Sequence, residues 1–215
     1  MSPVRFAALL FASSLLLAQK ASWQPAFTED FEGTRLNLAR WIPRDPLAAP
    51  LATSPATAPG LLNVSAGQLH MSGPAAISTF GLFAQPYGRF EIRFRIAAAG
   101  DTKARFRLLP VPLAPLPAID IFEVTASDKK KITFANSWGT PQTERSFGDS
   151  FAGPDLSAAF HTITLDWHHD NLTWFIDGKE KFHSSESVPS LPAYLLIDVP
   201  AGTLDIDYIR VWRRP

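Results

Sequence analysis

Apolar and charged residues alternate strictly between Phe90 and Ile96, and this run limits the fold of the chain more than any other feature. Phenylalanine and isoleucine stand at every second position, with glutamate and arginine between them. Successive side chains of a β-strand point to opposite faces, so this pattern is typical of a strand with one buried and one polar face. The run therefore predicts a half-buried antiparallel strand.

Similar segments recur at short intervals along the chain. Strand patterns occupy residues 26–31, 131–139, 160–167, 171–179, 193–198 and 204–212. After the N-terminal segment, no stretch keeps a helical period for two turns, and the five prolines between Pro43 and Pro59 predict a surface loop. We expect about eleven to thirteen short strands, at a spacing typical of an all-β sandwich.

The composition limits the partners and the number of domains. The 215 residues carry no net charge at pH 7 and include no cysteine. Balanced charge argues against nucleic acid or an anionic membrane as a partner, and no disulfide can form. Residues 22–215 are numerous enough to bury a substantial core, and we predict one domain there.

The first 21 residues have the features of a secretory signal peptide. A short segment that ends at Arg5 precedes an apolar run from Phe6 to Leu17, and small residues follow it. The run is shorter than the roughly 20 apolar residues of a transmembrane helix. We therefore predict that residues 1–21 are a removed signal and that the protein is secreted, periplasmic or part of the cell envelope, without an integral membrane segment. A retained N-terminal anchor is the alternative.

Two carboxylates interrupt the apolar segment from Leu116 to Val124. Strict alternation would place Asp120 and Glu123 on opposite faces of a strand, but one extra residue at Phe122, a β-bulge, brings both to the same face. Two acids on one face of an otherwise buried strand are costly unless a cleft lies over them. The segment therefore predicts a functional site.

The motif Ala118-Ile-Asp120-Ile-Phe-Glu123 resembles the Glu-x-Asp-x-x-Glu signature of glycoside hydrolase family 16, in the bulged form of laminarinase-type β-glucanases. In that family, the first Glu is the nucleophile, the Asp tunes and orients, and the last Glu is the acid/base. The resemblance implies catalytic roles for Asp120 and Glu123, and it places Ala118 at the nucleophile position. It also implies a concanavalin A-like jelly-roll β-sandwich of two curved antiparallel sheets with a concave cleft.

The resemblance also identifies candidate substrate contacts. Asn136 and Trp138 share one face of the expected strand at residues 131–139, although Trp138 fits the core as well as it fits a sugar platform. Lys103 and Arg107 stand where the family carries tryptophans, and we predict that Arg107 contacts substrate. Aromatic rings stack on the apolar faces of sugars, so the absence of these two weakens ordinary glucan binding.

One acidic residue is a candidate metal ligand. Asp207 matches a position that binds a structural calcium in many family members, and calcium prefers oxygen ligands. A strand-end acid that forms a hydrogen bond is the alternative interpretation. The five histidines show no metal-ligand spacing, so we expect no required cofactor and at most this structural calcium.

Three functions follow from these residues. Without a carboxylate at Ala118 no covalent glycosyl-enzyme can form there, and the loss of one catalytic member commonly costs on the order of 10⁴ to 10⁶ in rate. The first hypothesis is a degenerate or very weak hydrolase that binds a β-glucan-like polysaccharide. The second is an active O-glycosyl hydrolase of the endo-β-glucanase type, with Glu123 as acid/base, water as nucleophile and Asp120 as a poor base. Glu91 has no motif support as a replacement acid. The third is a non-catalytic interaction module of the cell envelope.

Overall fold

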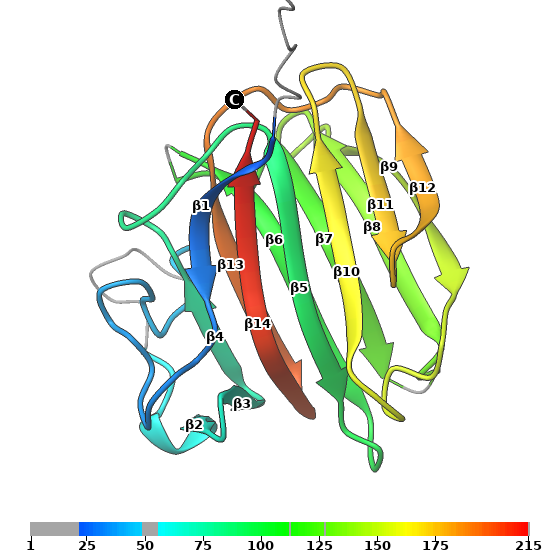
Figure 1. Ribbon diagram of the computed structural model, residues 1–215. Coiled ribbons are helices and arrows are strands. Elements are labelled where there is room, and N and C mark those ends of the chain that lie inside the picture. Colours follow the sequence, from blue (N-terminus) through cyan, green and yellow to red (C-terminus); the bar gives the residue numbers. More distant parts are fainter. Residues whose placement is uncertain (1–21, 49–55, 112, 127, 215) are drawn as a thin grey trace, which may run out of the picture.

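Two antiparallel β-sheets lie face to face in the computed structural model, which describes residues 22–48, 56–111, 113–126 and 128–214 (Figure 1). The first sheet has the strand order β12-β11-β10-β5-β14-β3-β2, and β1 also pairs with β14. Its strands are β1 (Gln24–Glu29), β2 (Leu62–Ser65), β3 (Gln68–Ser72), β5 (Gly88–Ile96), β10 (His161–Trp167), β11 (Leu172–Ile176), β12 (Lys179–Ser184) and β14 (Thr203–Arg213).

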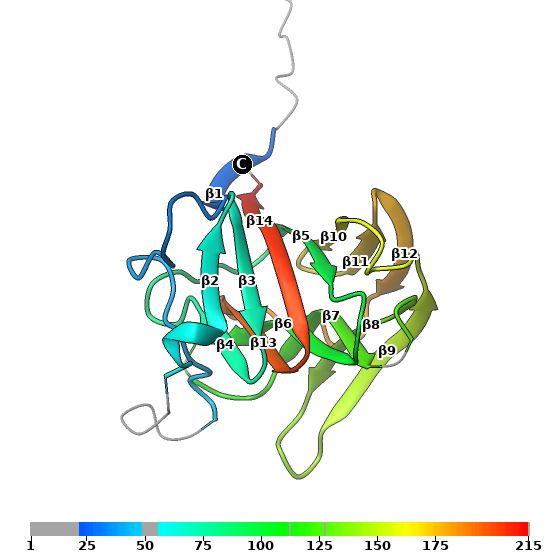
Figure 2. The same ribbon diagram turned by 90° about the horizontal axis from the view of Figure 1, so that it is seen from below.

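The second sheet has the order β4-β13-β6-β7-β8-β9, and it forms the layer behind the first sheet (Figure 2). Its strands are β4 (Ala75–Ser78), β6 (Thr102–Pro110), β7 (Ala118–Ala126), β8 (Lys131–Trp138), β9 (Arg145–Ala152) and β13 (Ala193–Ala201). A single 3-10 turn, η1 (Pro59–Leu61), is the one helical element of the described residues. The predicted all-β sandwich is confirmed, and the described residues hold fourteen strands, slightly more than expected.

Strand β5 shows why the alternating sequence gives this architecture. Phe90, Ile92 and Phe94 are fully buried between the sheets, whereas the charged residues between them are half-buried on the outer face. β10 and β14 pair with β5 on either side, so every backbone edge of this strand is used. The half-buried strand predicted from the sequence therefore lies in the middle of the first sheet.

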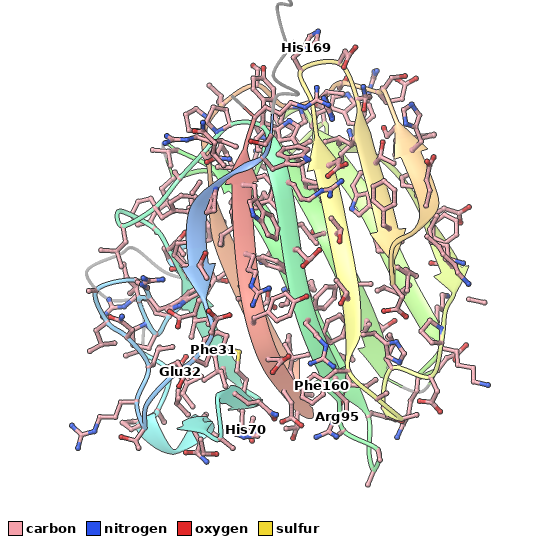
Figure 3. The ribbon with its side chains drawn as sticks, in the orientation of Figure 1. Phe31, Glu32, His70, Arg95, Phe160 and His169 are labelled. Carbon is pink, nitrogen blue, oxygen red and sulfur yellow. The ribbon has the colours of Figure 1, made fainter. Side chains whose placement is uncertain are left out.

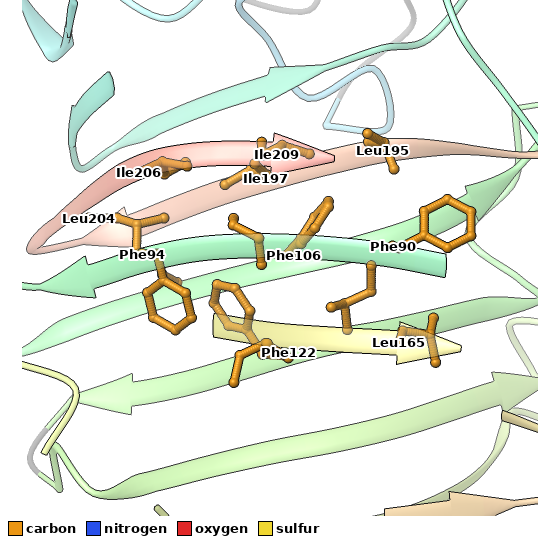
Figure 4. Packing of buried hydrophobic residues seen from close by; sticks show 14 of the residues in the cluster. Phe90, Phe94, Phe106, Phe122, Leu165, Leu195, Ile197, Leu204, Ile206 and Ile209 are labelled. Atoms are coloured by element: carbon orange, nitrogen blue, oxygen red, sulfur yellow. The ribbon is translucent and has the colours of Figure 1, made fainter. Parts of the chain in front are cut away.

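Aromatic side chains fill the space between the two sheets (Figure 4). The ring of Phe122 on β7 stacks on that of Phe94 on β5, with centroids 4.3 Å apart, and it meets the edge of Phe106 at 6.3 Å. All three side chains are fully buried. Removing a phenylalanine from such a position typically destabilises a protein by about 3–5 kcal/mol. This packing fixes the inner face of β7 and so determines which residues its other face presents.

The described residues that precede η1 lie beside β4, at one edge of the second sheet. The Thr57 hydroxyl donates to the Ala76 carbonyl at 2.8 Å and accepts from the Ala76 amide at 2.9 Å. The loop is therefore attached to the sheet on this side.

No helix in the described part of the chain is long and apolar enough to span a membrane. The predicted signal at residues 1–21 lies outside the described residues.

Candidate functional site

A bulge in β7 places the two predicted carboxylates on one face of the second sheet. Asp120 pairs with Ala135 and Glu123 with Thr133 of β8, so the two residues between the acids stand opposite only one residue of β8. Those two residues, Ile121 and Phe122, are both fully buried in the core. The predicted bulge is therefore present, and it turns both acids toward the outer face of this sheet.

The acids line a cleft of about 280 Å³ over β6, β7 and β8. The strands contribute Arg105, Arg107, Ala118, Asp120, Glu123 and Ser137, and the loops contribute Pro115, Leu116, Pro141 and Glu144. The carboxylates of Asp120 and Glu123 form no hydrogen bond or ion pair with any residue that the structure describes. Partly buried acids without a partner, at the wall of a cleft, are candidates for binding or proton transfer.

Two arginines of β6 stand directly opposite these acids. Arg105 pairs with Glu123 and Arg107 with Asp120 in the strand register. Both guanidinium groups bind the nearly buried carboxylate of Asp198 on β13, Arg105 at 2.8 Å and Arg107 at 3.2 Å. Burial lowers the pKa of Arg105, but the hydrogen bond and charge of Asp198 outweigh it, so the net shift is upward. Arg105 therefore stays charged beside the acids.

The cleft changes the proton affinity of Asp120. Burial raises the pKa of Asp120 to about 6; Arg107 acts in the opposite direction, and the charge of Glu123 adds to the increase. A carboxyl group with this pKa exchanges its proton near neutral pH, as a general acid or base must. The cleft thus holds one acid suited to proton transfer.

Ala118 occupies the floor of the cleft at the predicted nucleophile position. It stands opposite Ser137 on β8, and only 7% of its surface is exposed. Its methyl group belongs to a small apolar cluster with Leu109 and Leu196. No carboxylate of β7 can therefore act from this position.

Two further acids shape the cleft without a motif that marks them: one lines it, and the other binds its two arginines. Glu144 lies in the connection between β8 and β9, where no motif marks it. Asp198 was detectable in principle, because it continues the period-two series of Tyr194 and Leu196 as an acid in an apolar strand. Its partners on β6 are about ninety positions away in sequence, so only the pairing of β13 with β6 reveals its role.

Two predicted substrate contacts lie elsewhere. Asn136 is fully buried; its side-chain amide donates to the Glu186 carbonyl at 2.6 Å and accepts from the Ser184 hydroxyl at 2.9 Å. The alternation of β8 gives Trp138 the same orientation, so Ser137 faces the cleft in their place. Asn136 and Trp138 share one face of β8, as the alternation predicts, but that face is turned toward the first sheet. Arg107, the third predicted contact, does line the cleft.

Asp207, the candidate calcium ligand, lies on β14 in the first sheet. Its carboxylate forms a close ion pair with Arg93, at an irregular position in the pairing of β14 with β5. The described residues contain no group of three or more acidic or histidine side chains that could hold a metal ion. Glu91, also on the first sheet, accepts hydrogen bonds from Thr164 and Tyr208 on the face opposite the cleft.

Comparisons with known proteins agree on the relatives of this chain. Residues 47–201 match the family model described as glycosyl hydrolases family 16. A β-glucanase of Bacillus amyloliquefaciens is 26% identical over 130 residues, which are 60% of this chain and 51% of that protein. The chain therefore spans about half the length of this relative.

Solved structures show the same fold at lower identity. The catalytic domain of a laminarinase from Thermotoga petrophila is 20% identical, with a TM-score of 0.74 over 91% of this chain and 99% of that one. The laminarinase of Rhodothermus marinus is 19% identical, with a TM-score of 0.75 over 91% and 99% of the two chains. The predicted jelly-roll sandwich is confirmed by these likenesses.

Proposed function

Because this chain belongs to glycosyl hydrolase family 16, we propose that it binds a β-linked glycan in the cleft and hydrolyses it very slowly or not at all. Family membership confirms the resemblance predicted from the motif at residues 118–123, and it supports a β-glucan-like ligand. One observation supports the proposed loss of turnover: the cleft floor has the methyl group of Ala118 at the predicted nucleophile position.

Retaining hydrolysis needs a nucleophilic carboxylate about 5–5.5 Å from the acid/base, because the first step forms a covalent bond to the anomeric carbon. Alanine offers no oxygen for that bond. The remaining acids, Asp120 and Glu123, can still accept hydrogen bonds from sugar hydroxyls, and Arg107 can donate them. The cleft therefore keeps groups for recognition while it lacks the nucleophile.

The test combines binding with turnover on the same glycans. We expect laminarin or lichenan to bind in calorimetry, with affinity reduced by Glu123→Gln or Arg107→Leu, and no increase in reducing ends over long incubation. Leu38→Ala, at a side chain that is 66% exposed and does not line the cleft, is the matched control. Turnover by the natural chain at a rate typical of a working enzyme, ~1 s⁻¹ or faster, that Glu123→Gln abolishes would contradict the proposal.

A second candidate function is slow inverting hydrolysis, which the three acids of the cleft favour. Glu123 would give its proton to the glycosidic oxygen as the bond from that oxygen to the anomeric carbon breaks. Water would add to the anomeric carbon from the opposite side, and its proton would go to Asp120 or Glu144. Inverting enzymes hold their two carboxyl groups about 6.5–9.5 Å apart, which leaves room for that water.

The stereochemistry of the first product separates this candidate from ordinary family chemistry. Proton NMR of a digest should show the α-anomer first, and Asp120→Asn or Glu144→Gln should slow its release. A β-anomer as the first product would indicate retention and exclude this candidate.

Export from the cytoplasm is part of the proposal, supported by the apolar run from Phe6 to Leu17 after Arg5. We expect the protein in the extracytoplasmic fraction, with a mature N-terminus near residues 19–22 by mass spectrometry of the intact protein. An uncleaved chain in the cytoplasmic fraction argues against export. Flat binding across a glycan array would instead favour an interaction module of the cell envelope.

A further inference from the structure

Loops of the chain cover part of the outer face of the second sheet. Tyr194, Leu196 and Leu109 point away from the core between the sheets, yet none of them is exposed to solvent. Partly buried side chains from three loops pack over this cluster: Leu47, Phe80, Leu113 and Leu116. The ring of Phe80 meets that of Tyr194 edge-on, with centroids 5.1 Å apart. We call these four residues the apolar cap.

An ion-paired wall continues the barrier beside the apolar cap. Asp198 on β13 binds Arg105 and Arg107 on β6 and so joins the two strands across the outer face. A second hollow of about 400 Å³ lies behind Asp198, lined mostly by small apolar residues. It shares no lining residue with the cleft. The wall therefore separates the two spaces.

The opposite side of the cleft is open. Ser137 and Ala135 of β8 pair with Ser146 and Gly148 of β9, and both of these β9 residues are exposed. A Cβ atom on Gly148 would lie 2.4 Å from the Phe134 carbonyl oxygen and 2.6 Å from the Ala135 side chain, so no side chain fits at this position of β9 without a shift. The cleft thus opens toward β9 and closes toward β13.

We infer that this cleft receives the end of a β-glycan chain, or a short oligosaccharide, rather than an internal stretch of a long chain. The inference rests on the proposed function and specifies its ligand. An internal stretch must continue past the cleft in both directions across the sheet, whereas the apolar cap and the Asp198 wall block the direction toward β13. The volume of about 280 Å³ is close to the lower limit of about 300 Å³ for ligand pockets, which suits one or two sugar rings.

The experiment compares glycans with and without chain ends. Linear β-gluco-oligosaccharides from disaccharide to hexasaccharide, together with cyclic β-glucans of the same linkages, are titrated into the chain from residue 22 onward. We expect affinity to stop increasing beyond the trisaccharide and cyclic glucans to bind at least ~10-fold more weakly than linear ones, a difference of about 1.4 kcal/mol. Affinity that rises with each added sugar, together with equal binding of cyclic glucans, would overturn the inference and leave the proposed function intact. Absence of binding by every glycan would contradict the proposed function itself.

A variant of the apolar cap adds a second readout. Leu116→Ala shortens a cap residue that also borders the cleft, so we expect it to reduce the discrimination against cyclic glucans by at least ~3-fold. Leu38→Ala should leave that discrimination unchanged, and a thermal melt of each variant verifies that it folds. Unchanged discrimination in a folded Leu116→Ala variant would show that the apolar cap does not set the length limit.

Discussion

The outer faces of the two sheets carry the same kinds of side chain but use them differently. On the first sheet, each arginine of β5 has an acid of its own: Arg89 binds Asp166 through two hydrogen bonds of 2.7 Å, and Arg95 binds Asp205 at 2.9 Å. Arg95 also lies over the ring of Phe160, and the two are neighbours at the lower end of the sheet in Figure 3. All three arginines of β5 are therefore held in ion pairs on this face.

On the second sheet, two arginines share one carboxylate, and two other carboxylates form no ion pair with the described residues. Asp198 binds both Arg105 and Arg107, while Asp120 and Glu123 form no ion pair within the described residues. A carboxylate held in an ion pair has less capacity left for a ligand, whereas an unpaired carboxylate in a cleft keeps all of it. This difference indicates that the candidate site lies where carboxylates form no ion pair, and not where charged residues are most numerous.

The largest effect is expected from placing an acid at position 118 of the second sheet. Ala118→Glu should raise the rate of reducing-end release by on the order of 10³-fold or more, because it supplies the nucleophile of a retaining pair. Ala118→Gln is the control, since it has nearly the same shape without the nucleophilic oxygen. Equal rates for both variants would show that the cleft lacks more than the nucleophile.

Removing the shared acid should cost the most stability. Asp198→Asn leaves two guanidinium groups without their carboxylate, and breaking a buried pair typically costs about 3–5 kcal/mol. Since the Arg105 side chain is 37% exposed, solvent reduces this, and we expect a loss of about 2–3 kcal/mol in urea unfolding. An unchanged midpoint would contradict the description of Asp198 as the wall between the two spaces.

The stability of the chain should depend on pH through Asp120. Burial raises the pKa of Asp120 to about 6 in the folded state, against about 3.9 in an unfolded chain. Between about pH 4 and 6 the folded state keeps a proton that the unfolded state has released, so the free energy of unfolding falls as pH rises. Because Asp120 is partly exposed, we expect the change to be about 1–2 kcal/mol.

Denaturant unfolding of the natural chain and of Asp120→Asn, at a series of pH values, measures this dependence. The difference between the two should grow from pH 4 to 6 and stay constant above pH 6. A difference that does not vary with pH would indicate that Asp120 titrates as an ordinary surface acid.

The smallest effect is expected on the outer face of the first sheet. Asp166→Asn removes one paired acid from a partly exposed position, where such pairs contribute about 0.2–1 kcal/mol. We expect a loss of less than about 1 kcal/mol and no change in glycan affinity. A loss as large as that of Asp198→Asn would remove the distinction between the two faces.

Much of the fold could be predicted from local sequence, because β5 and β7 carry their patterns within nine residues each. Strand β9 could not, because nearly all its residues are exposed and no apolar period marks it. The bulge in β7 was predictable, since it alone brings Asp120 and Glu123 to one face. Which face of β8 looks into the cleft was not, because that depends on which side the first sheet packs against.

The remaining parts of the site depend on contacts that are distant in sequence. The ion pair between Arg105 and Asp198 requires β13 to lie beside β6. Glu144 reaches the cleft through the connection from β8 to β9. The apolar cap draws on loops that contain Leu47, Phe80 and Leu116. No local pattern specifies such contacts, because the position of each loop depends on the strands against which it packs.

Ala118 lines the cleft and also packs in the apolar cluster under the cap. A substitution at this position therefore affects both the chemistry of the cleft and the stability of the fold. A glutamate at this position would place a charge against side chains that now exclude water. We therefore expect Ala118→Glu to show both higher turnover and a lower melting temperature, because the same side chain changes activity and stability in opposite directions.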